Sequence, residues 1–247
     1  MRLFFLRRFL FALLALCAAL PLAAQTDTSA HATFRIVPRR PVEVLRTEAL
    51  TLTPPAGLGG PRTADLVELV TLDPSIKLDI RYASTNNFMG AAMYSQARAF
   101  LQRPAAEAAA RAHRALAHEG YGLLIHDAYR PWYVTWMFWE ATPDSQHTFV
   151  ANPATGSRHN RGAAVDLTLY DLATGRPVRM PSGYDEFSER AYPAYPGGTT
   201  TERERRDLLR RYMEAEGFAV NSAEWWHFDF AGWKDYPVLN APFERIR

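Results

Sequence analysis

Cysteine is almost missing from this sequence, because Cys17 is the only one among 247 residues. It lies inside an N-terminal segment that we expect to be removed, so a mature chain would contain no cysteine. This excludes disulfide bonds, a thiolate nucleophile and thiolate metal ligands. Any metal ion that the mature chain binds must therefore be held by histidine, aspartate or glutamate side chains.

A large excess of charge of either sign is also missing. The chain has 28 Lys and Arg against 26 Asp and Glu, a formal net charge of +2. Loss of the N-terminal segment, with Arg2, Arg7 and Arg8, would leave about −1. A near-neutral body gives no electrostatic reason to expect a nucleic-acid partner. Hydrophobic residues make up 48% of the chain, which favours a folded core over disorder.

The apolar run from Phe9 to Leu20 is short for a transmembrane helix. It follows a basic start and precedes a small-residue stretch that ends at Ala24. This order is typical of a signal peptide over residues 1–24. The segment predicts export, to the periplasm of a bacterium, with no stable membrane span once it is removed. The alternative is an uncleaved segment that anchors the protein to the membrane.

The rest of the chain divides into two parts. Residues 25–63 are rich in Thr, Ala, Pro and Gly and lack a long apolar period, which predicts a tether. The stretch RIVPRRPVEVL within it could add one edge strand. From residue 64 to 247, strand-like alternation mixes with amphipathic helical patterns, as in residues 201–218. Because no regular strand–helix–strand repeat is present, we expect one α+β domain there.

The motif SRHNRGAAVDLTLYD contains a histidine and an acid that could share a metal ion. His159 precedes Asp166 by seven residues, and Asp166 lies within an apolar strand-like run. A carboxylate in such a run is unfavourable unless it is paired or bound to a metal. Gly162 would let the backbone bend so that the two side chains converge. The alternative is an aspartate that forms a salt bridge with an arginine.

The motif AEWWHFDF contains a second pair, with Glu224 three residues before His227. A catalytic zinc site needs three protein ligands, an open position, and a nearby carboxylate that accepts a proton from water. His227 can be the third ligand and Glu224 the base. The alternative is an ordinary aromatic core strand. Taken together, the two motifs supply a complete set of three ligands and a base.

A third motif, HDAYRPWY, places Arg130 at the end of a predicted strand, just before Pro131. A guanidinium group is permanently charged and rigid, so Arg130 could stabilise an oxyanion beside the metal. The alternative is a structural arginine paired with Asp127 or with another acid.

In this order and spacing, the motifs DAYRP, SRHNRGAAVDLTLYD and EWWHF resemble the zinc-dependent D-alanyl-D-alanine dipeptidases of the VanX type, in peptidase family M15. The resemblance runs from about residue 64 to the end and includes IRYASTNNFMG. It implies an α+β fold with a small, mostly antiparallel sheet flanked by helices, like that of the hedgehog and D,D-peptidase group. Enzymes of this family that act in the cytoplasm have neither an export signal nor a tether.

The resemblance also implies a role for each residue that matches a family motif. His159, Asp166 and His227 would hold one zinc ion per chain. Glu224 would be the general base and later the proton donor, and Arg130 would stabilise the tetrahedral intermediate. Residues that would contact the substrate are Ser157, Asp185, Tyr82 and Tyr94, with Asp185 holding its free amino group.

The function that we expect is hydrolysis of the dipeptide D-alanyl-D-alanine to two D-alanines. The first alternative is a zinc D,D-carboxypeptidase that acts on the stem peptides of peptidoglycan. The second is a non-catalytic module that binds the cell wall or a partner and contains a structural zinc ion. Structural zinc sites usually have four protein ligands, and the sequence offers no obvious fourth one.

Overall fold

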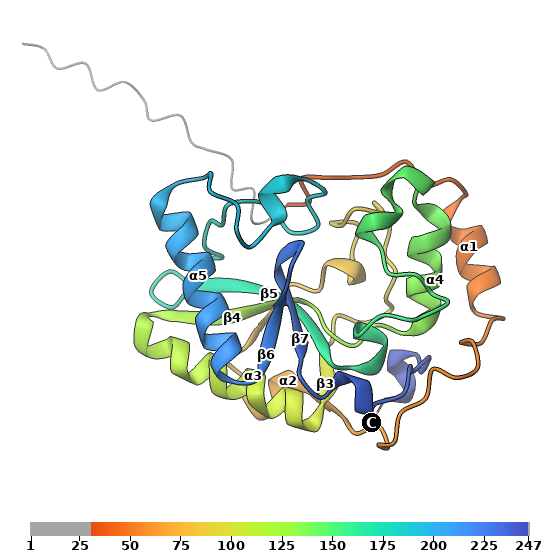
Figure 1. Ribbon diagram of the computed structural model, residues 1–247, viewed down its shortest axis with the longest axis horizontal. Coiled ribbons are helices and arrows are strands. Elements are labelled where there is room, and N and C mark those ends of the chain that lie inside the picture. The colour runs from red at the N-terminus through yellow and green to blue at the C-terminus, as the bar shows by residue number, and fades with distance from the viewer. Residues whose placement is uncertain (1–30, 247) are drawn as a thin grey trace, which may run out of the picture.

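The computed structural model describes residues 31–246, so the expected signal peptide lies outside the described residues. The centre of the molecule is a five-stranded sheet with the strand order β2-β4-β5-β7-β6 (Figure 1). Its strands are β2 Lys77–Leu78, β4 Tyr121–Asp127, β5 Ala164–Asp171, β6 Phe218–Asn221 and β7 Glu224–Phe230. Only the short β2 pairs in parallel, with β4, and the other pairs are antiparallel. The expectation of an α+β fold with a small, mostly antiparallel sheet is confirmed.

A second, two-stranded sheet pairs β1 Leu66–Glu68 with β3 Phe100–Gln102. The short helix α2 Leu69–Leu72 follows β1 directly. The backbone N–H of Gln102, the last residue of β3, donates to the carbonyl oxygen of Gly162. The small sheet is therefore tied to the turn that precedes β5.

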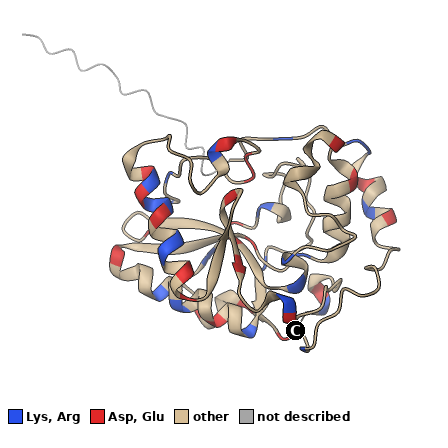
Figure 2. Ribbon diagram, in the orientation of Figure 1, with Lys and Arg blue, Asp and Glu red and all other residues tan. Residues whose placement is uncertain are grey.

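Two long helices, α3 Arg103–Leu116 and α5 Thr200–Ala215, lie side by side near the sheet (Figure 1). Helix α5 begins with a capping box, in which Thr199 and Glu202 each accept the other's backbone N–H. The helix expected over residues 201–218 is thus confirmed, with bounds shifted by a few residues. Figure 2 shows both signs of charge alternating along α5, and the pair Arg210–Glu214 is one example.

On the other side of the sheet, α4 Trp132–Ala141 packs against α1 Val42–Ala49 (Figure 1). The prediction that RIVPRRPVEVL could form an edge strand is wrong, because this stretch forms no strand and its last residues begin helix α1. Pro41 fixes the backbone just before the helix, and Leu45 and Ala49, one turn apart, bury their side chains completely. This part of the expected tether therefore packs on the domain. The boundary at residue 64 stays a prediction.

Short 3₁₀ helices connect the main elements: η1 Arg81–Ala83, η2 Ala117–Glu119, η3 Asp144–Phe149, η4 His159–Arg161, η5 Glu189–Ala191, η6 Trp233–Asp235 and η7 Phe243–Arg245. One hydrophobic core runs through the sheet and helices, and β5 is buried along almost its whole length. None of the helices between residues 31 and 246 is both long and apolar enough to cross a membrane.

Candidate metal centre and substrate cavity

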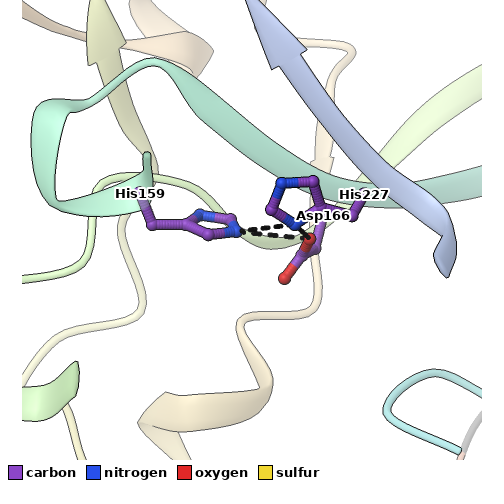
Figure 3. Close-up of side chains that lie close together, drawn as sticks. All are labelled: His159, Asp166 and His227. Atoms are coloured by element: carbon purple, nitrogen blue, oxygen red, sulfur yellow. Dashed lines mark hydrogen bonds and ion pairs between the residues drawn. The ribbon is translucent and has the colours of Figure 1, made fainter. Parts of the chain in front are cut away.

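Three side chains from separate elements converge at one point, as Figure 3 shows. His159 comes from η4, Asp166 from β5 and His227 from β7. His159 Nε2 lies 3.2 Å from His227 Nδ1 and 3.4 Å from Asp166 Oδ1, and the last two atoms are 3.1 Å apart. All three side chains are buried. The structure therefore brings together the three residues that the sequence motifs singled out.

Strand register explains why these residues meet. Asp166 on β5 is paired with His227 on β7 and, on its other side, with Asp127 on β4. Side chains at paired positions of neighbouring strands point to the same face of a sheet. The functional residues therefore form a row across three strands.

The turn before β5 places His159 over this row. Gly162 ends η4 with φ 64°, a left-handed conformation that favours glycine. A Cβ atom at this position would lie only 2.5 Å from Cδ2 of Leu66. Both facts restrict position 162 to glycine. The backbone bends at this residue, as we expected from the sequence, and the side chains of His159 and Asp166 meet.

The donor set fits a metal ion. Asp166 Oδ1 is buried and accepts no well-directed hydrogen bond within residues 31–246, although two imidazole nitrogens lie 3.1 and 3.4 Å away. A buried carboxylate oxygen without such a partner is unfavourable. Two imidazole nitrogens and one carboxylate oxygen aimed at one point are suited to a divalent cation. The cluster could hold a metal ion.

Both imidazole rings are held from outside the cluster. His159 Nδ1 donates to the carbonyl oxygen of Ala128 at 2.7 Å, and His227 Nε2 donates to Asp229 Oδ1 at 2.9 Å. Such hydrogen bonds fix the ring orientation and leave the inner nitrogen for the metal. The sequence analysis missed Asp229. It lies two residues after His227 on a strand, which places both side chains on one face and could have revealed it.

The charges of the cluster depend on one another. Burial opposes ionisation of Asp166, but the neighbouring His159 and His227 hold its pKa well below the usual range. Burial likewise lowers the pKa of His227, but the close contacts with the carboxylates of Asp166 and Asp229 raise it to about 10. Without metal, His227 therefore keeps a proton at neutral pH. A metal ion must displace that proton, so binding strengthens as the pH rises toward this value.

Glu224, the first residue of β7, lies at the edge of the cluster. Its Oε2 atom is 3.5 Å from His227 Nδ1, and it lines the adjoining cavity. Burial raises the pKa of Glu224, and the negative charge of Asp166 adds to the rise although His227 opposes it. A carboxylate with a raised pKa is suited to accept a proton and return it.

Arg130 lies close to the other side of Asp166. Its Nε and Nη2 atoms both donate to Asp127 Oδ2, at 2.9 and 2.7 Å, and Nη2 is 3.9 Å from Asp166 Oδ2. Arg130 therefore forms the ion pair with Asp127 that we considered as an alternative role. It also lines the cavity. Its Nη1 atom has no hydrogen-bond partner among the described residues. Asp127 thus positions Arg130 beside the cluster.

Two tyrosines lie on this side of the site, and the sequence analysis was wrong about one of them. Tyr94 does not line the cavity, because its buried hydroxyl group donates to Asp127 Oδ1 at 2.7 Å. This hydrogen bond holds the carboxylate of Asp127, which in turn holds Arg130. Tyr184, which the sequence analysis missed, donates to Asp166 Oδ2 at 2.9 Å.

The cavity beside the cluster has a volume of about 420 Å³, and Ser157, Tyr82 and Asp185 are among the residues that line it. Ser157 Oγ accepts the backbone N–H of His159. Tyr82 donates to Asp185 Oδ2 at 2.8 Å. Burial, and then the charge of Asp166, raise the pKa of Asp185 well above its usual range. Asp185 also has φ 55°, which is rare for a residue with a side chain. A cationic group that entered the cavity would favour its charged form.

Comparison with known proteins gives one consistent result. A family model described as D-ala-D-ala dipeptidase matches residues 62–244. The D-alanyl-D-alanine dipeptidase of Escherichia coli (strain K12) is 38% identical over 181 residues, which cover 73% of this chain and 92% of that protein. The D-alanyl-D-alanine dipeptidase of Enterococcus faecium is 35% identical over 187 residues, 68% of this chain and 91% of that protein. The D-alanyl-D-alanine dipeptidase of Streptomyces coelicolor is 32% identical over 184 residues, which cover 67% of this chain and 91% of that protein.

Proposed function

The chain belongs to the D-alanyl-D-alanine dipeptidase family, the M15 peptidases, and from that premise we propose that it is a zinc enzyme that hydrolyses D-alanyl-D-alanine. One observation carries the proposal. His159, Asp166 and His227 converge at the wall of a cavity that Glu224 and Arg130 also line. This arrangement combines ligands, a base and a fixed cation around one place where a peptide carbonyl can lie.

Zinc is the metal that we propose for the cluster. Two imidazole nitrogens and one carboxylate oxygen are a common set of ligands for catalytic zinc, with a further position left open. Among residues 31–246, these three side chains form the candidate ligand group, and Glu224 lies beside it with Oε2 3.5 Å from His227 Nδ1. When bound, zinc supplies a Lewis acid that polarises the carbonyl group and acidifies a water molecule.

The protein's own residues move the proton and stabilise the charge. Glu224 accepts the proton of the attacking water, and its raised pKa allows it to pass that proton to the leaving amine. Arg130, held by Asp127, places a permanent positive charge where the carbonyl oxygen becomes negative. Because Asp127 fixes the guanidinium before the substrate binds, little reorganisation is needed during the reaction.

Asp185 provides the preference for a dipeptide. It is buried in the cavity wall and held by Tyr82, so the free ammonium group of a short substrate could pair with it. A longer substrate would place an uncharged amide against this carboxylate, and a buried acid without a matching partner is unfavourable. This argument favours the dipeptidase over the D,D-carboxypeptidase. A structural zinc module is disfavoured because Glu224 lies outside the ligand group.

A substrate panel tests the proposal. We expect the zinc-loaded protein to cleave free D-alanyl-D-alanine with a kcat/KM at least a hundredfold above that for a stem pentapeptide ending in the same two residues. The L,L-dipeptide is the stereochemical control, and release of D-alanine is measured. A preference for the pentapeptide would instead support the carboxypeptidase and remove the role of Asp185.

We also propose that the enzyme is exported and acts outside the cytoplasm, in a bacterium in the periplasm. The support is the order of basic, apolar and small residues over residues 1–24. Cell fractionation tests it, by comparing the full chain with a chain that lacks residues 1–24. The full chain should be found outside the cytoplasm, and equal cytoplasmic amounts of both would contradict export.

A further inference from the structure

Three cationic side chains surround the indole ring of Trp233 on η6. Arg158 Cζ lies 4.8 Å from the ring centroid, Arg161 Cζ 5.6 Å and Lys234 Nζ 5.5 Å. Cations at such distances are attracted to the face of an indole. Trp233, Arg158 and Arg161 also line the cavity beside the metal cluster. We call Arg158, Arg161 and Lys234 the cationic rim.

Arg158 is the member of the rim that is free to bind a ligand. Its Nε lies 3.2 Å from Asp229 Oδ2, and its side chain is 44% exposed. Its Nη1 and Nη2 atoms have no hydrogen-bond partner in the part of the chain that the structure describes. Arg161, in contrast, is buried and donates through Nη1 to the carbonyl oxygen of Tyr236.

Two contacts restrict the guanidinium group of Arg158 and leave one of its edges without a partner. Asp229 holds the Nε side and the indole of Trp233 lies against the group. The remaining edge has two parallel N–H donors, which match the two oxygens of a carboxylate. Because these two contacts already restrict the side chain, less rotamer entropy is lost when a carboxylate binds.

The position of Arg158 indicates which carboxylate this is. The cavity contains Asp185, the proposed partner of the substrate ammonium group, and Arg158 lines the same cavity. In sequence, Arg158 stands between Ser157, another lining residue, and His159 of the metal cluster. A free dipeptide carries one ammonium and one carboxylate group, separated by the bond that is cleaved. The cavity therefore offers the carboxyl group of Asp185 to the ammonium end of such a molecule and the guanidinium group of Arg158 to its carboxylate end.

We propose that Arg158, held by Asp229 and Trp233, binds the C-terminal carboxylate of the dipeptide substrate. The inference rests on the proposed function and extends it, since Asp185 and Arg158 together would select a substrate that is free at both ends. A dipeptide whose carboxylate is replaced by an amide would leave the Arg158 edge without its charged partner.

The test compares D-alanyl-D-alanine with its C-terminal amide in the zinc-loaded protein and in Arg158→Gln. For the wild-type protein we expect kcat/KM to favour the free acid by about 10- to 100-fold, as for other hydrogen bonds between ions. Arg158→Gln should lower kcat/KM for the acid by a similar factor and change that for the amide by less than about threefold. The matched control is Arg111→Gln on α3, an arginine that is 50% exposed and paired with Glu216.

Activity on the C-terminal amide of the dipeptide distinguishes carboxylate binding by Arg158 from a purely structural role of this residue. If Arg158 acted only through Asp229 on His227, the substitution would lower activity on both compounds equally and reduce the zinc content. The inference would be overturned if Arg158→Gln lowered kcat/KM equally for the acid and the amide. It would also be overturned if the variant kept the wild-type ratio of kcat/KM for the two compounds.

A binding measurement separates this inference from the proposed function. Calorimetric titration of acid and amide into zinc-loaded Glu224→Gln should show tighter binding of the acid. The additional substitution Arg158→Gln should abolish this preference, and Arg158→Lys should restore part of it. If wild-type protein cleaved neither compound, the proposed function would fail, and the titration would still decide the role of Arg158. Equal affinities for acid and amide would overturn that role.

Discussion

Replacing Glu224 with glutamine is expected to lower kcat for D-alanyl-D-alanine by about a thousandfold, within the usual range for loss of a general base. Glutamine keeps the size of the side chain but cannot accept the proton of water at neutral pH. Glu224 lies outside the group of three metal-binding side chains, so the protein should retain one zinc ion. The measurement is steady-state kinetics together with metal analysis of the same samples.

The matched control for this substitution is Glu216→Gln. The Glu216 side chain is 25% exposed, close to the 22% of Glu224, but it pairs with Arg111, which projects from α3. Its replacement should leave kcat unchanged within about twofold. Full activity of Glu224→Gln would show that another group accepts the proton. Loss of zinc from this variant would show instead that Glu224 is a ligand.

Removal of the metal ion is expected to abolish measurable hydrolysis and to lower the midpoint of thermal unfolding. A metal that binds only the folded protein stabilises it by an amount that grows with the ratio of its concentration to Kd. In the metal-free protein, His159, Asp166 and His227 still contact one another, so the fold itself should persist. Dialysis against a chelator, followed by activity and unfolding measurements, checks both effects.

Much of the candidate site could be predicted from the sequence because its parts are local. His159 and Asp166 lie within one turn and strand, and Glu224 and His227 lie within another strand. An acid within an apolar strand and a glycine at a sharp turn are signals that physical chemistry explains. Sequence spacing could not give the register that pairs Asp166 with His227 and Asp127. That register is set by packing of the whole sheet.

What the sequence could not provide is mostly the support around the site. Tyr94 and Tyr184 come from distant segments, and only the fold shows that their hydroxyl groups donate to Asp127 and Asp166. The carbonyl oxygen of Ala128, which orients His159, is a backbone atom and has no sequence signal. Helix α1 was missed because its proline-rich approach is typical of a linker. Its stability comes from packing on α4 rather than from local propensity.

Arg158 and Arg161 of the cationic rim lie within the motif SRHNRGAAVDLTLYD, but the motifs did not indicate the tryptophan that they contact. Trp233 lies beyond the EWWHF motif, in a short 3₁₀ helix with no apolar period of its own. Its role in placing Arg158 depends on contact between η6 and the turn that carries His159. Selection of a zwitterionic dipeptide would then rest on two side chains, Asp185 and Arg158, that lie far apart in sequence.

The central claim is that His159, Asp166 and His227 hold the zinc ion on which dipeptide hydrolysis depends. The most direct measurement is titration of metal-free protein with zinc while hydrolysis of D-alanyl-D-alanine is followed. Activity should rise linearly and reach a plateau at one zinc ion per chain, and Asp166→Ala should neither bind zinc tightly nor become active. Full activity of the metal-free protein, or wild-type zinc affinity in Asp166→Ala, would contradict the claim.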